Sequence, residues 1–274
     1  LGVYFIGNKN DPGLMQELDD AITQIQYLKP GYQELLAAKY LYSQSYSSFT
    51  LNQKEQSYLN QLLSTKKPLR VAFPTNWRPI AYTDPKTGEA QGIMADVFTR
   101  ISQLTGLHFE YIPQEEASQA DIRATISSDF TWADEHNTYL SQSVFEVPIF
   151  MVESPQPEHP DILALVSDSH LSRAVPEHLL QESSSSQYLY FNSVTECMEA
   201  VSSGKAGRTY ITSYELNYYV NQHRFAHLKA QPVPGFTESI SIGVAKTNNP
   251  LLCSIICQAL RSIPPTEINR IILN

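Results

Sequence analysis

The amino-acid sequence predicts an α/β fold in the form of a two-lobed clamp, and three observations support this prediction. Short apolar segments with strand character alternate with amphipathic helices from residue 69 onward, a pattern typical of largely parallel sheets. Two proline-rich segments, 153–161 and 232–235, divide this region into an outer pair of segments and one inner block. Hydrophobic residues make up 42% of the chain and charged residues 17%, which excludes a disordered chain, because disorder requires low hydrophobicity with dense charge.

The first part of the chain contains a segment that is repeated near its other end. Residues 1–25 and 242–263 share a layout in which LGV or IGV precedes an Asn-rich turn, a proline and a helix. From Pro12 and Pro250 onward the two segments align without gaps, and their apolar residues fall at one helical phase. A proline is tolerated at the first position of a helix. Chance similarity of any strand, turn and amphipathic helix is the alternative interpretation.

A helical connector follows the first copy of this repeat. Residues 30–44 have a helical pattern, and Thr50 or Asn52 can cap a second, short helix that extends through Leu62. We therefore predict that residues 1–67 are the C-terminal remnant of a preceding similar module plus a helical connector. Because the chain opens at LGVYFIG without an initiator Met, we expect it to be an excised piece of a longer protein.

The outer pair of segments, 68–154 and 235–274, is predicted to form lobe 1. Its first long helix has apolar residues on one side, and Gly106 is placed to end it with a left-handed cap. The predicted elements are strand 69–73, turn 84–88, helix 92–104, strands 108–112, 149–152 and 240–245, a helix from Pro250 to 263 and a last helix at 264–273.

The inner block, 155–234, is predicted to form lobe 2. Ser193 can cap a helix that runs to Val201, and Glu196 three residues later completes a capping box. The remaining predicted elements are strand 162–166, strand 208–212 and a tyrosine-rich helix at 214–222. The alternation of strands and helices thus continues through both lobes.

The charge balance limits the possible partners of the protein. The sequence has 19 basic and 28 acidic side chains, a formal net charge of −9, and no window in which Lys and Arg collect. This argues against a nucleic-acid partner, which requires a basic face. No stretch approaches the roughly 20 apolar residues that cross a bilayer. A small molecule or another protein is therefore the expected partner.

Three segments resemble the extracellular solute-binding proteins of family 3, which have the type 2 periplasmic-binding or Venus flytrap fold. They read RVAFPTNWRPIAYTDPKTGEAQGIMADVF, NSVTECMEAVSSGKAG and PGFTESISIGVAKTNNPLL, and the similarity spans about residues 69–273. The resemblance implies capture of a small-molecule ligand, an amino acid or another small polar solute, between two lobes. Tandem clamps of this kind are typical of bacterial sensor kinases and diguanylate cyclases. We therefore expect an extracytoplasmic sensor domain, tethered to a membrane in the full-length protein, whose closure is transmitted to a membrane-spanning helix.

The sequence departs from the pattern of family members that bind amino acids at three places. His136 stands where an Arg that binds the α-carboxylate is expected, and Thr212 stands where an Asp often binds the α-ammonium. An imidazole does not replace a bidentate guanidinium. Between residues 112 and 122 there is no room for the helix that usually separates two strands. These departures argue against a standard amino acid as the ligand.

The predicted lining of the cleft combines aromatic rings with hydroxyl groups, which suits a neutral or weakly polar ligand. The candidate residues are Trp77, Tyr82, Ser127, Ser128, Trp132, His136, Ser169 and Thr212. Simple core or hinge packing of the two tryptophans is the alternative, and Arg78 or Arg208 could supply a guanidinium from a new position. His223 and His227 have a spacing that can share zinc, but no third ligand accompanies them, so we expect no metal and no cofactor.

Several functions compete with the sensor interpretation. A degenerate, ligand-free spacer or dimerisation module is one, with Tyr210, Tyr214, Tyr218 and Tyr219 as a possible contact between two copies of a homodimer. A solute-binding receptor of an amino-acid ABC transporter is another. An enzyme on this scaffold would require a group such as Asp96, Glu135 or His136 over the cleft. Because no GxSxG, HExxH or GxGxxG motif occurs, we expect no catalysis.

Overall fold

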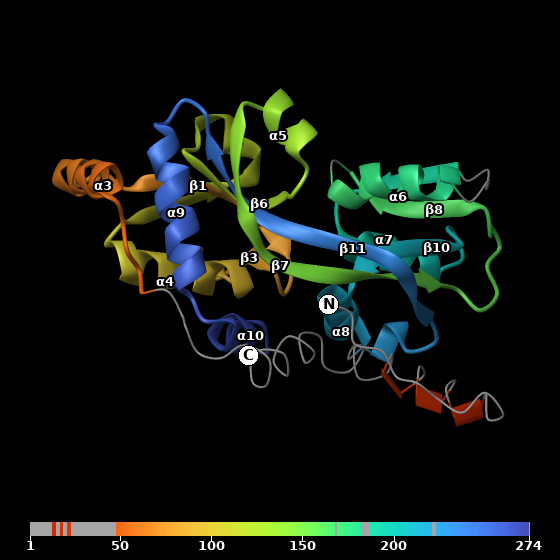
Figure 1. Ribbon diagram of the computed structural model, residues 1–274. Coiled ribbons are helices and arrows are strands. Elements are labelled where there is room, and N and C mark those ends of the chain that lie inside the picture. The colour runs from red at the N-terminus through yellow and green to blue at the C-terminus, as the bar shows by residue number, and fades with distance from the viewer. Residues whose placement is uncertain are drawn as a thin grey trace.

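The computed structural model in Figure 1 describes residues 48–167, 169–181, 187–220 and 223–273, together with the pairs 13–14, 17–18 and 21–22. The three pairs are helical. The strand predicted at the start of the chain, the rest of the repeat in residues 1–25 and the helix predicted at 30–44 lie outside the described residues. The interpretation of this segment as the remnant of a preceding module therefore stays a prediction.

In the described part of the chain, one mixed sheet of eight strands extends through the molecule (Figure 1). Its strands, in spatial order, are β5 Phe109–Pro113, β1 Leu69–Phe73, β6 Ile122–Ser127, β11 Lys229–Ala245, β7 Thr138–Glu153, β10 Arg208–Thr212, β8 Ile162–Val166 and β9 Gln187–Phe191. β1 is parallel to β5 and β6 in lobe 1, and β8 is parallel to β9 and β10 in lobe 2. The predicted α/β architecture is confirmed.

The long strands β7 and β11 connect the two lobes. They pair antiparallel with each other, and the pairing is interrupted between Pro232 and Thr237. Thr237 pairs with Pro148 on one side of this interruption, and Pro232 pairs with Phe150 on the other. Proline lacks the N–H that a regular ladder requires, so these prolines lie where the ladder is broken. The passage between the lobes is thus a pair of continuous strands with a local irregularity.

β7 crosses from lobe 1 to lobe 2 earlier in the chain than predicted. The proline-rich segment 153–161 was the predicted crossing, with lobe 1 extending to residue 154. Residues 149–153, however, pair with β10 in lobe 2, from Ile149 opposite Thr212 to Glu153 opposite Arg208. β7 continues through Pro148 into lobe 2 and ends at Glu153. The proline-rich segment therefore follows the crossing and forms a loop within lobe 2.

Lobe 1 is a layer of helices against the β5, β1 and β6 side of the sheet (Figure 1). Its helices are α3 Gln53–Thr65, α4 Ile93–Thr105, α5 Phe130–Glu135, α9 Pro250–Ser262 and α10 Pro265–Leu273, and a small second sheet contains β2 Asn76–Trp77, β3 Ala81–Thr83 and β4 Ala90–Gln91. Phe98 of α4 and Phe73 of β1 are buried in its core, together with Ile255 of α9. The predicted left-handed cap is confirmed, because Gly106 has φ 76° and its N–H donates to the Ser102 carbonyl.

The segment between β5 and β6, where the sequence leaves no room for the helix usual in the family it resembles, forms a 3-10 helix, η1 Gln114–Gln119. It follows Pro113 at the end of β5 and returns the chain to β6 on the other side of β1. The first residues of η1 are thereby placed at the edge of lobe 1 that faces lobe 2, as the next subsection shows.

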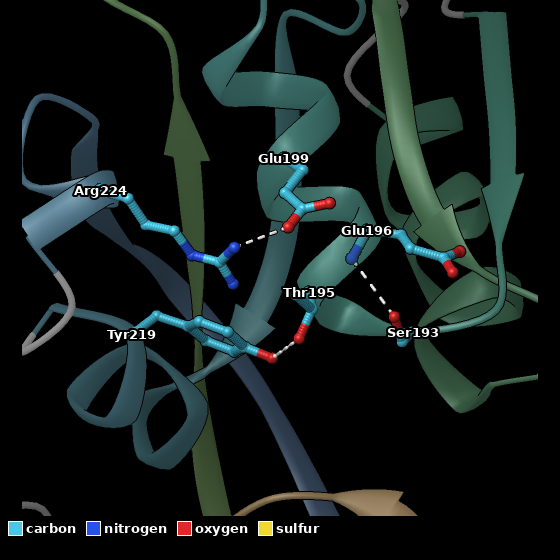
Figure 2. Close-up of polar contacts among 6 residues, drawn as sticks. All are labelled: Ser193, Thr195, Glu196, Glu199, Tyr219 and Arg224. Carbon is cyan, nitrogen blue, oxygen red and sulfur yellow. Dashed lines mark hydrogen bonds and ion pairs between the residues drawn. The ribbon is translucent and has the colours of Figure 1, made fainter.

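Lobe 2 contains α6 His170–Gln181, α7 Val194–Ser202, α8 Ser213–Val220 and η2 His223–Phe225. Ser193 caps α7 as predicted, since its Oγ accepts from the Glu196 N–H at 3.3 Å. Figure 2 shows two further contacts that fix α7 to its neighbours. Thr195 is hydrogen-bonded to the Tyr219 hydroxyl at 2.8 Å, and Glu199 pairs with Arg224 at 2.7 Å.

The tyrosines that could have formed a contact between two copies are mostly buried. The exposed fractions of Tyr210, Tyr214 and Tyr219 are 6%, 5% and 5%, and only Tyr218 among the four is exposed, at 40%. The ring of Tyr214 contacts Phe145 of β7 edge-on, with centroids 5.9 Å apart. Tyr210, Tyr214 and Tyr219 therefore do not form the exposed contact between two copies that was considered, and Tyr214 packs against the sheet.

The connector helix α3 is attached to lobe 1 by a buried carboxylate. Asn52 is the N-cap, as one of the two predicted alternatives stated, and forms a capping box with Glu55. Glu55 is only 2% exposed, and its second oxygen accepts a hydrogen bond from Ser254 of α9 at 2.5 Å. Leu59, one turn later, is buried in the lobe 1 core. Helix α3 is therefore part of the lobe 1 surface layer.

Replacing this carboxylate should measurably weaken the attachment. Glu55→Ala removes half of the capping box and leaves the Ser254 hydroxyl without its acceptor, so we expect a loss of about 1–2 kcal/mol in the free energy of unfolding. This corresponds to a fall of roughly 2–8 °C in Tm for a domain of this size. Lys54→Ala, at the exposed neighbouring position, serves as the control. Equal Tm values for the two variants in a calorimetric scan would contradict the assigned role of Glu55.

Candidate ligand-binding cleft

A cavity of about 340 Å³ lies between the two lobes. Lobe 1 contributes the loop after β1, the start of η1, the end of β6 and Trp132 of α5. Lobe 2 contributes the end of β8 and the residues that follow it, the start of α7, and the end of β10 with the start of α8. A second hollow of about 520 Å³ lies on the outer surface of lobe 1, between α5, β7 and α9, and none of the predicted site residues lines it.

Five of the eight predicted site residues line the cavity between the lobes. They are Trp77, Ser127, Trp132, Ser169 and Thr212. Ser127 and Thr212 are the last residues of β6 and β10. Trp77, Trp132 and Ser169 follow β1, β6 and β8 by three to five residues. Because the carboxyl ends of the strands of both lobes face the same crevice, loops from distant parts of the chain meet there.

The other three predicted residues lie outside the lining. Tyr82 is on β3, where the Arg78 guanidinium covers its ring at 3.8 Å. Ser128 is hydrogen-bonded to Ser241 of β11 at 2.6 Å, so its hydroxyl helps to hold the sheet. His136 is exposed and stacks on Trp132, with ring centroids 4.1 Å apart and the planes 14° from parallel. Tyr82 pairs with Asn76 and His136 stacks on Trp132, and both of these partners line the cavity.

Glu215, whose carboxyl group accepts three hydrogen bonds in the cleft, was not among the predicted site residues. This side chain of α8 is 2% exposed and lines the cavity. Its Oε2 accepts hydrogen bonds from the Thr212 N–H at 2.7 Å and from the Thr212 hydroxyl at 2.8 Å. Its Oε1 accepts from the indole N–H of Trp77 at 2.8 Å. Since Trp77 belongs to lobe 1 and Glu215 to lobe 2, this hydrogen bond joins the lobes across the cleft.

A local signal for Glu215 is present in the sequence. Thr212 and Glu215 are the first and last residues of TSYE, which matches the capping-box pattern. The reciprocal bond from the Glu215 N–H to the Thr212 hydroxyl, at 3.2 Å, is present in the structure. A capping box predicts the start of a helix, but not that its carboxylate is buried against the other lobe.

Burial governs the ionisation of Glu215. Removal from water raises the pKa of this carboxyl from 4.5 to about 7, against the lowering effect of the hydrogen bonds from Thr212. The nearby carboxylate of Glu238, which is 3% exposed on β11 and also lines the cavity, raises it further. At neutral pH the cleft therefore contains a carboxyl group close to the midpoint of its titration.

Two further contacts cross between the lobes. The guanidinium of Arg173, in α6 of lobe 2, lies 5.4 Å from the ring centroid of Trp132 in lobe 1. Phe145, on the lobe 1 part of β7, contacts Tyr214 at the start of α8. With the bond from Trp77 to Glu215, these contacts hold the lobes in a closed arrangement around the cavity.

The residues considered for catalysis or metal binding do not converge on the cleft. Asp96, Glu135 and His136 are exposed and lie outside the cavity lining. His227 is hydrogen-bonded to Ser202 at 3.2 Å. Within the described ranges, no group of three His, Cys, Asp or Glu side chains is placed to hold a metal ion.

Comparison with solved structures identifies the fold. The periplasmic VFT2 domain of BvgS from Bordetella pertussis superposes with a TM-score of 0.69 at 20% sequence identity, over 82% of this chain and 98% of that domain. This chain has a Venus flytrap fold. An ancestral arginine-binding protein bound to arginine matches over 74% of this chain and 96% of its own length, with a TM-score of 0.63 and 17% identity. The predicted type 2 periplasmic-binding fold is therefore confirmed.

A third Venus flytrap neighbour is the ancestral amino acid-binding protein AncCDT-1, described as a precursor of cyclohexadienyl dehydratase. It matches over 78% of this chain and 96% of its own length, with a TM-score of 0.62 and 16% identity. Neither the protein-family models nor the curated proteins include a match. Among the described residues, no helix has the length and apolar character needed to span a bilayer.

Proposed function

We propose that this Venus flytrap domain is the extracytoplasmic, small-molecule-binding sensor domain of a bacterial membrane signalling receptor. The observation that carries the proposal is the cavity of about 340 Å³ between the lobes. Residues from elements and loops of both lobes meet there, as expected of a site that closes around a ligand. The periplasmic location in the name of the BvgS domain supports an extracytoplasmic placement.

The proposed mechanism follows from the strands that join the lobes. Because β7 and β11 are the crossings and their pairing is interrupted at 232–237, the lobes can rotate with little change inside either core. A ligand that contacts both lobes stabilises the closed form by its difference in affinity for the closed and open forms. Transmission of this rotation to a membrane-spanning helix in the full-length protein is part of the proposal.

A thermal-shift screen over amino acids, amines, sugars and organic acids tests this function. A ligand at 100 times its Kd adds about 2.7 kcal/mol to the free energy of unfolding, which raises Tm by roughly 5–10 °C for a domain of this size. We expect at least one class of compound to produce such a shift, with no turnover of any compound. A flat result across the screen would contradict ligand sensing.

The direct contacts between the lobes favour a second candidate function. The hydrogen bond from Trp77 to Glu215 closes the cleft through protein groups alone, which also suits a ligand-free spacer module. The two candidates differ in the screen, because a spacer module shows no ligand-induced shift.

Removing the donor of this bond should open the cleft. Trp77→Phe keeps an aromatic ring but leaves a buried carboxylate oxygen of Glu215 without its partner, a loss of about 1–3 kcal/mol from the closed form. We expect the radius of gyration from small-angle X-ray scattering to increase in this variant. Trp132→Phe is the control, since the contacts of Trp132 with Arg173 and His136 use the ring face, which phenylalanine retains. If both variants scatter like the parent protein, the bond does not hold the lobes together.

A further inference from the structure

We propose that the ligand of this cleft is an organic cation, an amine or amidine compound without a carboxylate, and this inference rests on the proposed sensor function. The predicted lining residues carry aromatic rings and hydroxyl groups, which suit a neutral or weakly polar ligand. The lining in the structure also contains carboxylates, which were not predicted.

The charged groups of the lining are predominantly acidic. Three carboxylates, Glu115, Glu215 and Glu238, face the cavity against one guanidinium, that of Arg173, which leaves two negative charges in excess (three minus one) when all are ionised. Glu215 and Glu238 are 2% and 3% exposed, whereas Arg173 is exposed to solvent. Water therefore screens the positive group more than Glu238 and the ionised fraction of Glu215, and the interior of the cavity attracts cations.

Three of the hydrogen-bond donors of the lining already donate to protein acceptors. The Trp77 indole N–H and the Thr212 hydroxyl donate to Glu215. The hydroxyl of Ser169 donates to the Val166 carbonyl at 2.8 Å. A ligand carboxylate would have to compete with these bonds, while an ammonium group adds a donor beside the buried carboxyl groups of Glu215 and Glu238.

The cavity also offers acceptors and aromatic faces that suit an N–H cation. The Oε1 atom of Gln114, at the start of η1, is buried and has no hydrogen-bond partner among the described residues. An N–H group of a ligand would satisfy it. Trp77, Trp132 and Tyr210 supply aromatic rings to the lining, and tryptophan faces attract ammonium and guanidinium groups.

The position that would bind a ligand carboxylate lies outside the cavity. By resemblance, His136 stands where amino-acid receptors have an Arg, and its ring is stacked on the outside of Trp132 and exposed. An amino acid would thus lose its carboxylate partner but keep an acidic cleft for its ammonium group. Recognition of the amine alone is the arrangement that these groups support.

Isothermal titration calorimetry of the full chain with matched compounds tests whether the cleft prefers a positively charged ligand. Phenethylamine, 2-phenylethanol, phenylacetate and phenylalanine share one skeleton, and agmatine differs from arginine by a carboxylate. We expect each amine to bind at least about tenfold more tightly than its matched compounds, a difference of about 1.4 kcal/mol. Tighter binding of phenylacetate, 2-phenylethanol or either amino acid than of its matched amine would overturn the inference.

Variants of the carboxylates locate the effect in the cleft. Glu238→Gln should weaken binding of phenethylamine and agmatine about tenfold, and Glu115→Gln, at an exposed position of the lining, should change it threefold or less. Unchanged amine affinity in Glu238→Gln would contradict the inference. If sugars or organic acids bind and the amines do not, only the cation inference fails. If no compound of the wider screen binds, the sensor function fails with it.

Discussion

Raising the pH from 5 to 8 should lower the free energy of unfolding of the ligand-free protein, and Glu215→Gln should remove most of this loss. Burial raises the pKa of Glu215 from 4.5 to about 7. Between these values the folded state binds more protons than the unfolded state, so stability falls as the pH rises. At about 1.4 kcal/mol per pKa unit, the expected total is roughly 3 kcal/mol.

Urea unfolding at half-unit steps from pH 4 to pH 8.5 measures this dependence. The parent protein should lose stability mainly between pH 4.5 and pH 7.5, with little further loss above that range. In Glu215→Gln the same interval should be nearly flat, because the glutamine does not titrate. Glu89→Gln, at an exposed position, is the matched control and should keep the slope of the parent. Parallel curves for the parent and Glu215→Gln would show that Glu215 is not the titrating group.

The second large effect is expected from Gly92→Ala, at the start of α4. Gly92 has φ 97°, and a Cβ added there would lie 2.5 Å from the Pro79 carbonyl oxygen and 2.9 Å from that of Ile80. Both oxygens accept hydrogen bonds from the first N–H groups of α4, at Ile93 and Met94. The backbone conformation alone costs about 1–3 kcal/mol for a residue other than glycine, and the clash adds to this because both obstacles are backbone atoms.

We expect Gly92→Ala to lower Tm by roughly 10 °C, from a total cost of about 3–5 kcal/mol at about 2–4 °C per kcal/mol. Gly88→Ala separates the two contributions, because Gly88 also has a positive φ, 73°, but has nothing within 4 Å of an added Cβ. That variant should lose about 1–2 kcal/mol, the cost of the left-handed conformation alone. Since residues 79 and 80 follow Trp77 in the same loop, Gly92→Ala should also weaken lobe closure in small-angle scattering. Equal Tm values for the two alanine variants would contradict the assigned clash.

Most elements of the fold could be predicted from local signals. The strands at 69–73, 162–166 and 208–212 appear with the predicted bounds, because short apolar runs between turn residues have few alternatives. Helix ends were predicted where a capping residue is present, as at Asn52 and Ser193.

The strands that cross between the lobes were harder to predict. The proline-rich segment 232–235 was predicted as a break, and the strand before 153 was predicted to begin at 149, yet β11 runs through Pro232 and Pro234 and β7 through Pro148. A proline interrupts a strand only where its missing N–H is needed, and that depends on the register of the neighbouring strand. Register between β7 and β11, about 90 residues apart, is a tertiary property that local patterns do not contain.

The cleft was predictable to the extent that its residues follow strands. Trp77, Ser127 and Ser169 were found in this way. Glu215 and Gln114 were missed because a helix of buried tyrosines and a short acidic segment carry no pattern that distinguishes a buried polar group from a solvated one. His136 was placed by analogy with an arginine, but its ring stacks on Trp132 and does not line the cavity.

α3 and α10 are both attached to helices of lobe 1. α3 is held to α9 by Glu55 and Ser254, and α10 is held to α4 by the ion pair between Arg100 and Glu267 at 3.1 Å. Both helices are thus fixed to lobe 1, and under the proposed closure we expect lobe 2 to rotate against them about the two crossing strands. Fluorophores on α3 and α10 should keep a constant separation during closure, whereas a pair on α3 and α7 should change its energy transfer. In this arrangement the outer surface of lobe 2 is expected to move furthest, while the spacing of α3 and α10 stays constant.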